Sequence, residues 1–120
     1  MNPRRVHQLI RENFPELEAA KHEWVNVADA SGPRSEVIRQ LFEQHVSSNE
    51  ALVEVNRKLG DFLPKEEALQ FVATHLCEGV IRVANREFSG FMVIAANGVA
   101  TAWSHGANPS FNGTGFQPAR

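Results

Sequence analysis

Apolar residues near the start of the chain recur at helical spacing. Val6, Ile10 and Phe14 lie four residues apart, the separation that places side chains on one face of a helix. Asn2 provides a side chain that can cap a helix. Pro3 suits the first helical position because it lacks the N–H that would be unpaired there. The pattern predicts an N-terminal amphipathic helix.

Up to four more helices are predicted before residue 80. A short one covers residues 17–24, and a turn-forming run at 28–35 separates this N-terminal helix pair from the rest of the chain. The next predicted helices cover 35–46, 48–60 and 64–79, because apolar residues in each repeat every three or four positions. These stripes consist of Val37, Ile38, Leu41, Phe42, His45 and Val46, then Leu52, Val55 and Leu59, then Leu69, Val72 and Leu76.

The repeat then shortens to that of β-strands. We predict strands at 80–84, 88–96 and 99–104, because these runs are short and rich in β-branched and aromatic residues. Asn97 and Gly98, between the last two strands, predict a two-residue hairpin, since both positions of a type I′ turn require positive φ.

Together these elements predict an α+β fold. Four or five helices would pack on one side of a C-terminal three-stranded antiparallel β-meander. Residues 1–104 would form a single globular domain and residues 105–120 a loosely ordered tail. A chain of 120 residues with 42% hydrophobic side chains can bury a sufficient core without a disulfide or a metal ion.

The predicted turns also set the register, and hence the two faces of the sheet. A two-residue turn would place Met92 opposite Trp103, and a three-residue loop before it would place Arg82 opposite Gly90. One face would then contain the core. The other would hold Val80, Arg82, Phe88, Gly90, Met92, Ile94, Thr101 and Trp103.

This second predicted face is too apolar to remain in water, because Arg82 is its only charged residue. An antiparallel sheet normally covers an exposed face with polar side chains. Three covers are possible: the chain's own tail or N-terminal helix pair, a second copy of the chain, or a partner or ligand. Exposed apolar patches of this kind usually mark contact sites.

Charge and composition narrow the class of protein. The formal net charge of −2 argues against nucleic-acid binding, which usually requires a basic surface, and against attraction to anionic lipid. The one cysteine, Cys77, favours a reducing compartment. We find no secretory signal and no apolar run long enough to span a membrane. The expected location is the cytoplasm, without nucleic-acid or membrane partners.

Candidate chemistry is sparse. His75 and Cys77 lie two residues apart on a predicted helix and so point in different directions. A zinc site combining them with His45 would lack a close-spaced ligand pair. A winged-helix arrangement would use 64–79 as its recognition helix, but this segment carries one lysine and three glutamates, which phosphates repel. We predict no catalytic residue, metal or cofactor.

We therefore expect a small cytoplasmic, non-enzymatic binding or regulatory module, such as an adaptor, an inhibitor or an immunity-type protein. It would bind a protein partner, or a second copy as a homodimer, through the apolar sheet face. The alternative is a small-molecule-binding protein or an enzyme that uses His75 or His105 near the sheet. The predicted binding residues are Arg82, Gly90, Met92, Ile94, Thr101, Trp103 and His105.

Overall fold

A layer of antiparallel strands forms the centre of the protein. The computed structural model describes residues 2–56 and 58–104. In chain order its elements are α1 (Pro3–Asn13), the 3-10 helix η1 (Glu16–Lys21), β1 (Val25–Asn26), β2 (Ala28–Asp29), β3 (Gly32–Pro33), α2 (Ser35–Leu41), the π-helical turn η2 (Phe42–Val46), β4 (Glu50–Asn56), β5 (Leu59–Pro64), α3 (Lys65–Thr74), β6 (Ile81–Ala84), β7 (Gly90–Ile94) and β8 (Val99–Ser104).

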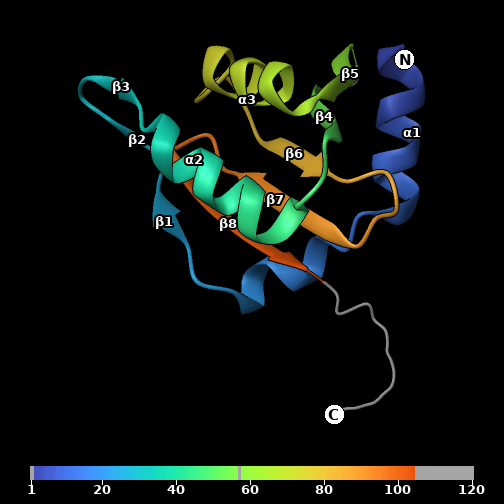
Figure 1. Cartoon of the computed structure of the whole chain (residues 1–120), viewed down its shortest axis with the longest axis horizontal. Coiled ribbons are helices and arrows are strands. Elements are labelled where there is room, and N and C mark those ends of the chain that lie inside the picture. The colour runs from blue at the N-terminus through green and yellow to red at the C-terminus, as the bar shows by residue number, and fades with distance from the viewer. Residues whose placement is uncertain (1, 57, 105–120) are drawn as a thin grey trace.

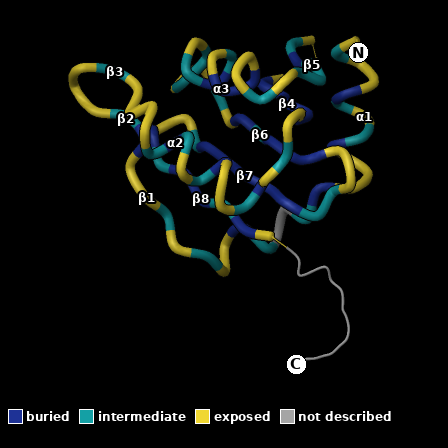
Figure 2. Tube along the Cα trace, viewed as in Figure 1, coloured by how far each residue is buried: buried dark blue, intermediate teal, exposed yellow. Residues whose placement is uncertain are grey.

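The main sheet has six strands in the order β1-β8-β7-β6-β4-β5, and every adjacent pair is antiparallel. The small β2–β3 hairpin projects from one end of the molecule (Figure 1). Helices cover both sides: α2, η2 and α3 pack on one, and α1 and η1 on the other. Figure 2 shows the central strands buried and the hairpin exposed.

The expected arrangement of four or five helices on a three-stranded meander is wrong, although the α+β class is right. The described residues form three α-helices, a six-stranded sheet and a two-stranded hairpin. The helices also lie on both sides of the sheet rather than on one. The meander β6–β7–β8 exists, and three further strands extend it.

The predicted helix over 48–60 is instead the β4–β5 hairpin, which adds two of those strands. Ala51 to Val55 are all buried, because helices cover both faces of β4. A strand buried on both faces needs no alternation of apolar and polar residues. The spacing of its apolar residues therefore resembled a helical stripe, and periodicity alone does not distinguish the two.

The hairpin at Asn97-Gly98 has a three-residue loop rather than the predicted two-residue turn. The Ala95 N–H donates to the Val99 carbonyl at 2.8 Å, and Gly98 alone in the loop has positive φ, at 87°. Three-residue hairpin loops usually end with one glycine in the left-handed conformation. It shifts the register by one position, so that Phe91 rather than Met92 lies opposite Trp103.

The β6–β7 connection is also longer than predicted. Asn85 N–H donates to the Gly90 carbonyl at 3.1 Å, leaving residues 86–89 as a four-residue loop. Val83 therefore lies opposite Met92. Because side chains alternate along a strand, the change at the β7–β8 turn moves Met92 away from the face that carries Trp103. The change at the β6–β7 loop places Met92 on the face of Val83 rather than on that of Arg82.

Two apolar clusters hold the layers together. We call the two sides of the sheet the α3 face and the α1 face. The α3 face buries Ala51, Val53, Val55, Ile81, Val83, Met92, Ile94 and Ala100. The α1 face buries Leu52, Ala84, Phe91, Val93 and Trp103.

Two of the predicted helices begin where the sequence places them. Asn2 caps α1 by accepting from the Arg5 N–H at 2.9 Å, and α2 starts at Ser35. Within residues 2–56 and 58–104, none of the helices is long and apolar enough to cross a bilayer.

Candidate binding groove

The predicted binding residues do not share one surface. Arg82, Thr101 and Trp103 lie on the α1 face, whereas Met92 and Ile94 are fully buried on the α3 face. His105 lies outside the described residues.

Gly90 does not leave a gap for a ligand. It packs against the end of η2, where a Cβ would collide with the His45 carbonyl oxygen and approach Val46 Cα to 2.8 Å. The Gly90 position is therefore a close contact between helix and sheet.

Trp103 belongs to the core, with 3% of its surface exposed. Its ring makes edge contacts with Phe14 at 5.9 Å and stacks on His22 at 5.2 Å with an interplanar angle of 8°. Thr101 donates its hydroxyl to the Glu23 carbonyl at 2.8 Å. The N-terminal segment, the first of the three expected covers, thus shelters the β8 end of the α1 face.

The register arranges the α1 face in two rows that cross the strands. An apolar row runs from Phe62 through Leu52, Ala84 and Phe91 to Trp103. A more polar row runs from Gly60 through Glu54, Arg82 and Val93 to Thr101.

Helix α1 lies across the strands between these rows. Val6 contacts the Gly60 region and Phe14 contacts Phe91. Successive helical residues are about 100° apart, so Leu9 and His7 project from opposite flanks of α1. The Leu9 flank borders the apolar row, and the His7 flank borders the polar row.

On the Leu9 flank the cover is incomplete, and a groove of about 560 Å³ remains. Ligand sites usually have volumes of roughly 300–1,000 Å³. We call this the arginine-rimmed groove. It is lined by Arg5, Leu9, Leu52, Phe62, Arg86 and Phe88.

The two arginines of the groove come from different elements. Arg5, on α1, donates to the Gln8 side chain at 3.2 Å. The Arg86 guanidinium, from the β6–β7 loop, lies 5.8 Å from the centre of the Phe62 ring, which is a cation–π distance. Across the described chain, neither guanidinium forms an ion pair with a carboxylate.

The loop that carries Arg86 and Phe88 is held by a buried amide. Asn85 is 5% exposed and donates to the Val46 carbonyl at 3.0 Å, while its oxygen accepts from the Ser89 N–H at 2.9 Å. This frame keeps Phe88 at φ 55°. Such a backbone conformation is costly for a bulky residue and persists only where the surroundings impose it. The loop side of the groove is therefore fixed before any ligand arrives.

On the other flank of α1 lies a buried polar cluster. Glu54 is 3% exposed, and its two carboxylate oxygens contact His7 Nδ1 and the Arg82 guanidinium, the latter at 3.4 Å. A buried carboxylate requires partners of this kind. The cluster fastens α1 to β4 and β6, and about a third of the His7 side chain, 32%, remains exposed.

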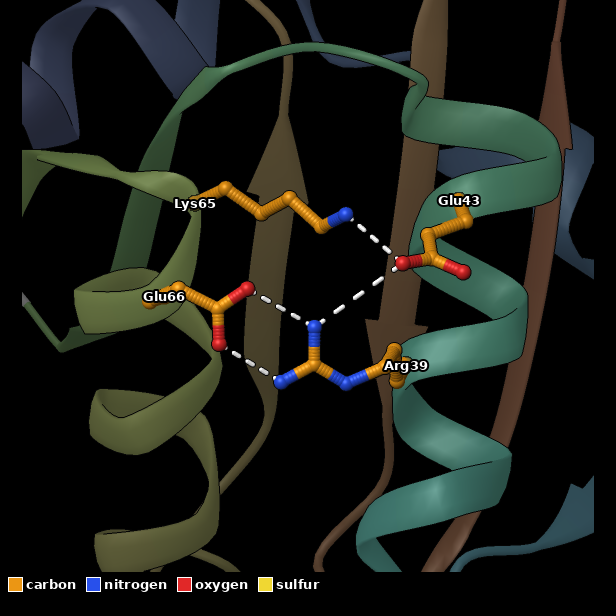
Figure 3. A network of polar contacts seen from close by, with 4 residues as sticks. All are labelled: Arg39, Glu43, Lys65 and Glu66. Atoms are coloured by element: carbon orange, nitrogen blue, oxygen red, sulfur yellow. Dashed lines mark hydrogen bonds and ion pairs between the residues drawn. The ribbon is translucent and has the colours of Figure 1, made fainter.

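A second charged network joins α2 to α3 (Figure 3). Arg39 binds both carboxylate oxygens of Glu66, at 2.6 and 2.8 Å, and Lys65 donates to Glu43 at 2.6 Å. The hydrogen bond from Lys65 lowers the pKa of Glu43, and that from Arg39 lowers the pKa of Glu66. All four groups are paired with one another on the surface, so we assign this network to helix docking.

The histidine and cysteine candidates are dispersed. His75 Nδ1 lies 3.0 Å from Glu78 Oε1, and its ring rests on Phe71 at 4.7 Å. Cys77 is an exposed free thiol. Burial, and next the charge of nearby His22, lower the pKa of His45. Within the part of the chain that the structure describes, no three His, Cys, Asp or Glu side chains are grouped to hold a metal ion.

Sequence reasoning missed the groove because its parts belong to four separate segments. The apolar spacing predicts Leu52 within the helix over 48–60 and Phe62 between two helices, so it does not predict their pairing across β4 and β5. The available signals are the sequence Arg-Glu-Phe at residues 86–88, in and next to the predicted three-residue loop, and the helical spacing of Arg5 and Leu9.

Comparison with known proteins adds no relative: no family model, no curated protein and no solved structure matches the chain.

Proposed function

We propose that the protein is a small non-enzymatic binding module whose ligand places an apolar group in the arginine-rimmed groove. The observation that carries this proposal is the partly covered end of the apolar row, between α1 and the β6–β7 loop, where Leu9, Phe62 and Phe88 remain partly exposed. Leu52 and Phe62 form its floor, and Leu9 and Phe88 stand beside them.

Preorganisation supports a binding role for this groove. The Asn85 side chain fixes the loop, and the Glu54 cluster fixes α1 from its other flank. A ligand that enters between two fixed walls loses little affinity to reordering of the protein. We place the module in the cytoplasm, where an exposed free thiol such as Cys77 is kept reduced.

We favour binding over catalysis because the buried polar side chains near the groove hold the fold together and are not free to react with a ligand. Glu54 and Asn85 are satisfied by partners that hold α1 and the β6–β7 loop in place. His75, the residue of the enzyme alternative, is held against Glu78 and Phe71 at the surface.

Titration with Nile red, an uncharged fluorescent apolar probe, tests the proposal. We expect saturable binding to the native chain and at least tenfold weaker binding to Leu9→Gln. Glutamine matches leucine in size and helix propensity, so this variant should keep the native circular dichroism spectrum. Val25→Gln is the matched control, because Val25 is an exposed apolar residue outside the groove. If Nile red does not bind, or binds Leu9→Gln as well as the native chain, the proposal fails.

A further inference from the structure

Resting on the proposed function, we infer that the ligand is an amphipathic small-molecule carboxylate, bound with its apolar body on Leu52 and Phe62 and its anionic headgroup between Arg5 and Arg86. The groove combines an apolar floor with two guanidiniums from α1 and the β6–β7 loop. This combination selects a molecule that has both an apolar and a negatively charged part.

The arginines of the groove differ from Arg39 and Arg82 in how their charge is paired. Arg39 pairs with Glu66, and Arg82 reaches Glu54. At the groove a carboxylate is close in sequence, because Glu87 follows Arg86 directly, yet the described chain shows no ion pair between them. Two positive groups that line one concavity repel each other, and an anion between them removes that repulsion.

The position of Arg86 also favours a carboxylate headgroup. Its guanidinium stands over the Phe62 ring at 5.8 Å, so it is held at the edge of the apolar floor. A planar guanidinium forms two parallel hydrogen bonds with a carboxylate, which adds geometric selection to charge attraction. Phe88, fixed at the loop tip, closes the same side of the groove and would contact the ligand's body.

A matched series of probes tests the headgroup. Octanoate, octan-1-ol and octylammonium carry the same chain with a negative, neutral or positive end. By isothermal titration calorimetry we expect octanoate to bind at least tenfold more tightly than octan-1-ol, and octylammonium to bind more weakly than either. The preference for octanoate should decrease as salt is added, because both arginines are exposed.

Variants assign the preference to the two arginines. Arg5→Gln and Arg86→Gln should each reduce it severalfold, and the double variant should abolish it while octan-1-ol still binds. Arg4→Gln is the matched control, since Arg4 is an exposed neighbour on α1 that does not line the groove. It should keep the full preference.

The outcomes separate this inference from the function on which it rests. If octanoate and octan-1-ol bind equally, and both weaken in Leu9→Gln, the groove binds apolar ligands but the carboxylate inference is overturned. A preference that survives in the double variant also overturns it. If none of the three probes and no Nile red binds, the proposed function itself fails.

Discussion

Trp103 provides the most direct test of how the α1 face is covered. Its side chain is 3% exposed and contacts the rings of Phe14, Phe91 and His22. Replacing a buried aromatic residue with alanine usually costs about 3–5 kcal/mol. Since small domains have a total stability of roughly 5–15 kcal/mol, Trp103→Ala should remove a large share of it. Urea denaturation followed by circular dichroism measures this loss.

Trp103→Phe should behave differently. The Trp103 Nε1 group is buried without a hydrogen-bond partner among residues 2–56 and 58–104, and burying such a group costs about 1–3 kcal/mol. Phenylalanine removes that cost but loses part of the packing that the larger indole ring provides. These two effects oppose each other, so the free energy of unfolding should change by no more than about 1 kcal/mol.

Trp24→Phe is the control for the indole nitrogen. The Trp24 Nε1 group donates to the Ala19 carbonyl at 3.2 Å, so this substitution loses a bond that Trp103→Phe does not. We expect Trp24→Phe to cost at least as much as Trp103→Phe, although Trp24 is less buried. If Trp103→Ala costs less than about 1 kcal/mol, Trp103 is not in the core. The N-terminal segment then does not cover the face in solution.

Three further predictions concern the helix contacts and the loop. Gly90→Ala should lower the free energy of unfolding, measured by urea denaturation, by about 3 kcal/mol or more, because the added Cβ would collide with the His45 backbone. Gly79→Ala is the control and should lower it little, since among the described residues a Cβ there meets one atom, at 4.0 Å. Asn85→Ala leaves the Val46 carbonyl without its partner; it should cost about 1–3 kcal/mol and weaken Nile red binding, and unchanged binding would show that the loop frame does not shape the groove. The folded-state pKa of His45 lies below its ordinary 6.5, so the unfolded chain takes up the proton first. The melting temperature should therefore fall as the pH decreases from 6.5, and His45→Gln should reduce that fall. If the melting temperature of His45→Gln depends on pH as steeply as that of the native chain, the pH dependence does not come from His45.

Part of the fold could be predicted from local signals. The Asn2 cap, the Ser35 start and the three C-terminal strands each depend on residues close together in sequence. The β4–β5 hairpin could not be read in this way, because α1 and α3 bury both faces of β4 and so remove the alternation that identifies a strand.

The candidate groove was beyond sequence reasoning for a similar cause. Its floor requires Leu52 and Phe62 to be paired across two strands, and its walls require α1 to cross those strands. The predicted register was also wrong by one position at the β7–β8 turn. A two-residue type I′ turn needs positive φ at both Asn97 and Gly98, whereas in the structure Gly98 alone of the two has positive φ. A shift of one position reverses the face of every side chain on a strand.

By itself, the sequence determined that the C-terminal strands are apolar on both sides and that neither side can remain in water. Hydrophobicity is a property of each residue, so it can be read without a structure. The tertiary structure decided what provides the cover. It brought Phe14 and His22 onto Trp103 and left Leu9 and Phe62 partly exposed beside two arginines. Which segments cover the sheet depends on contacts between residues far apart in the chain. The loop-closure and packing energies of such contacts cannot be read from a local sequence pattern.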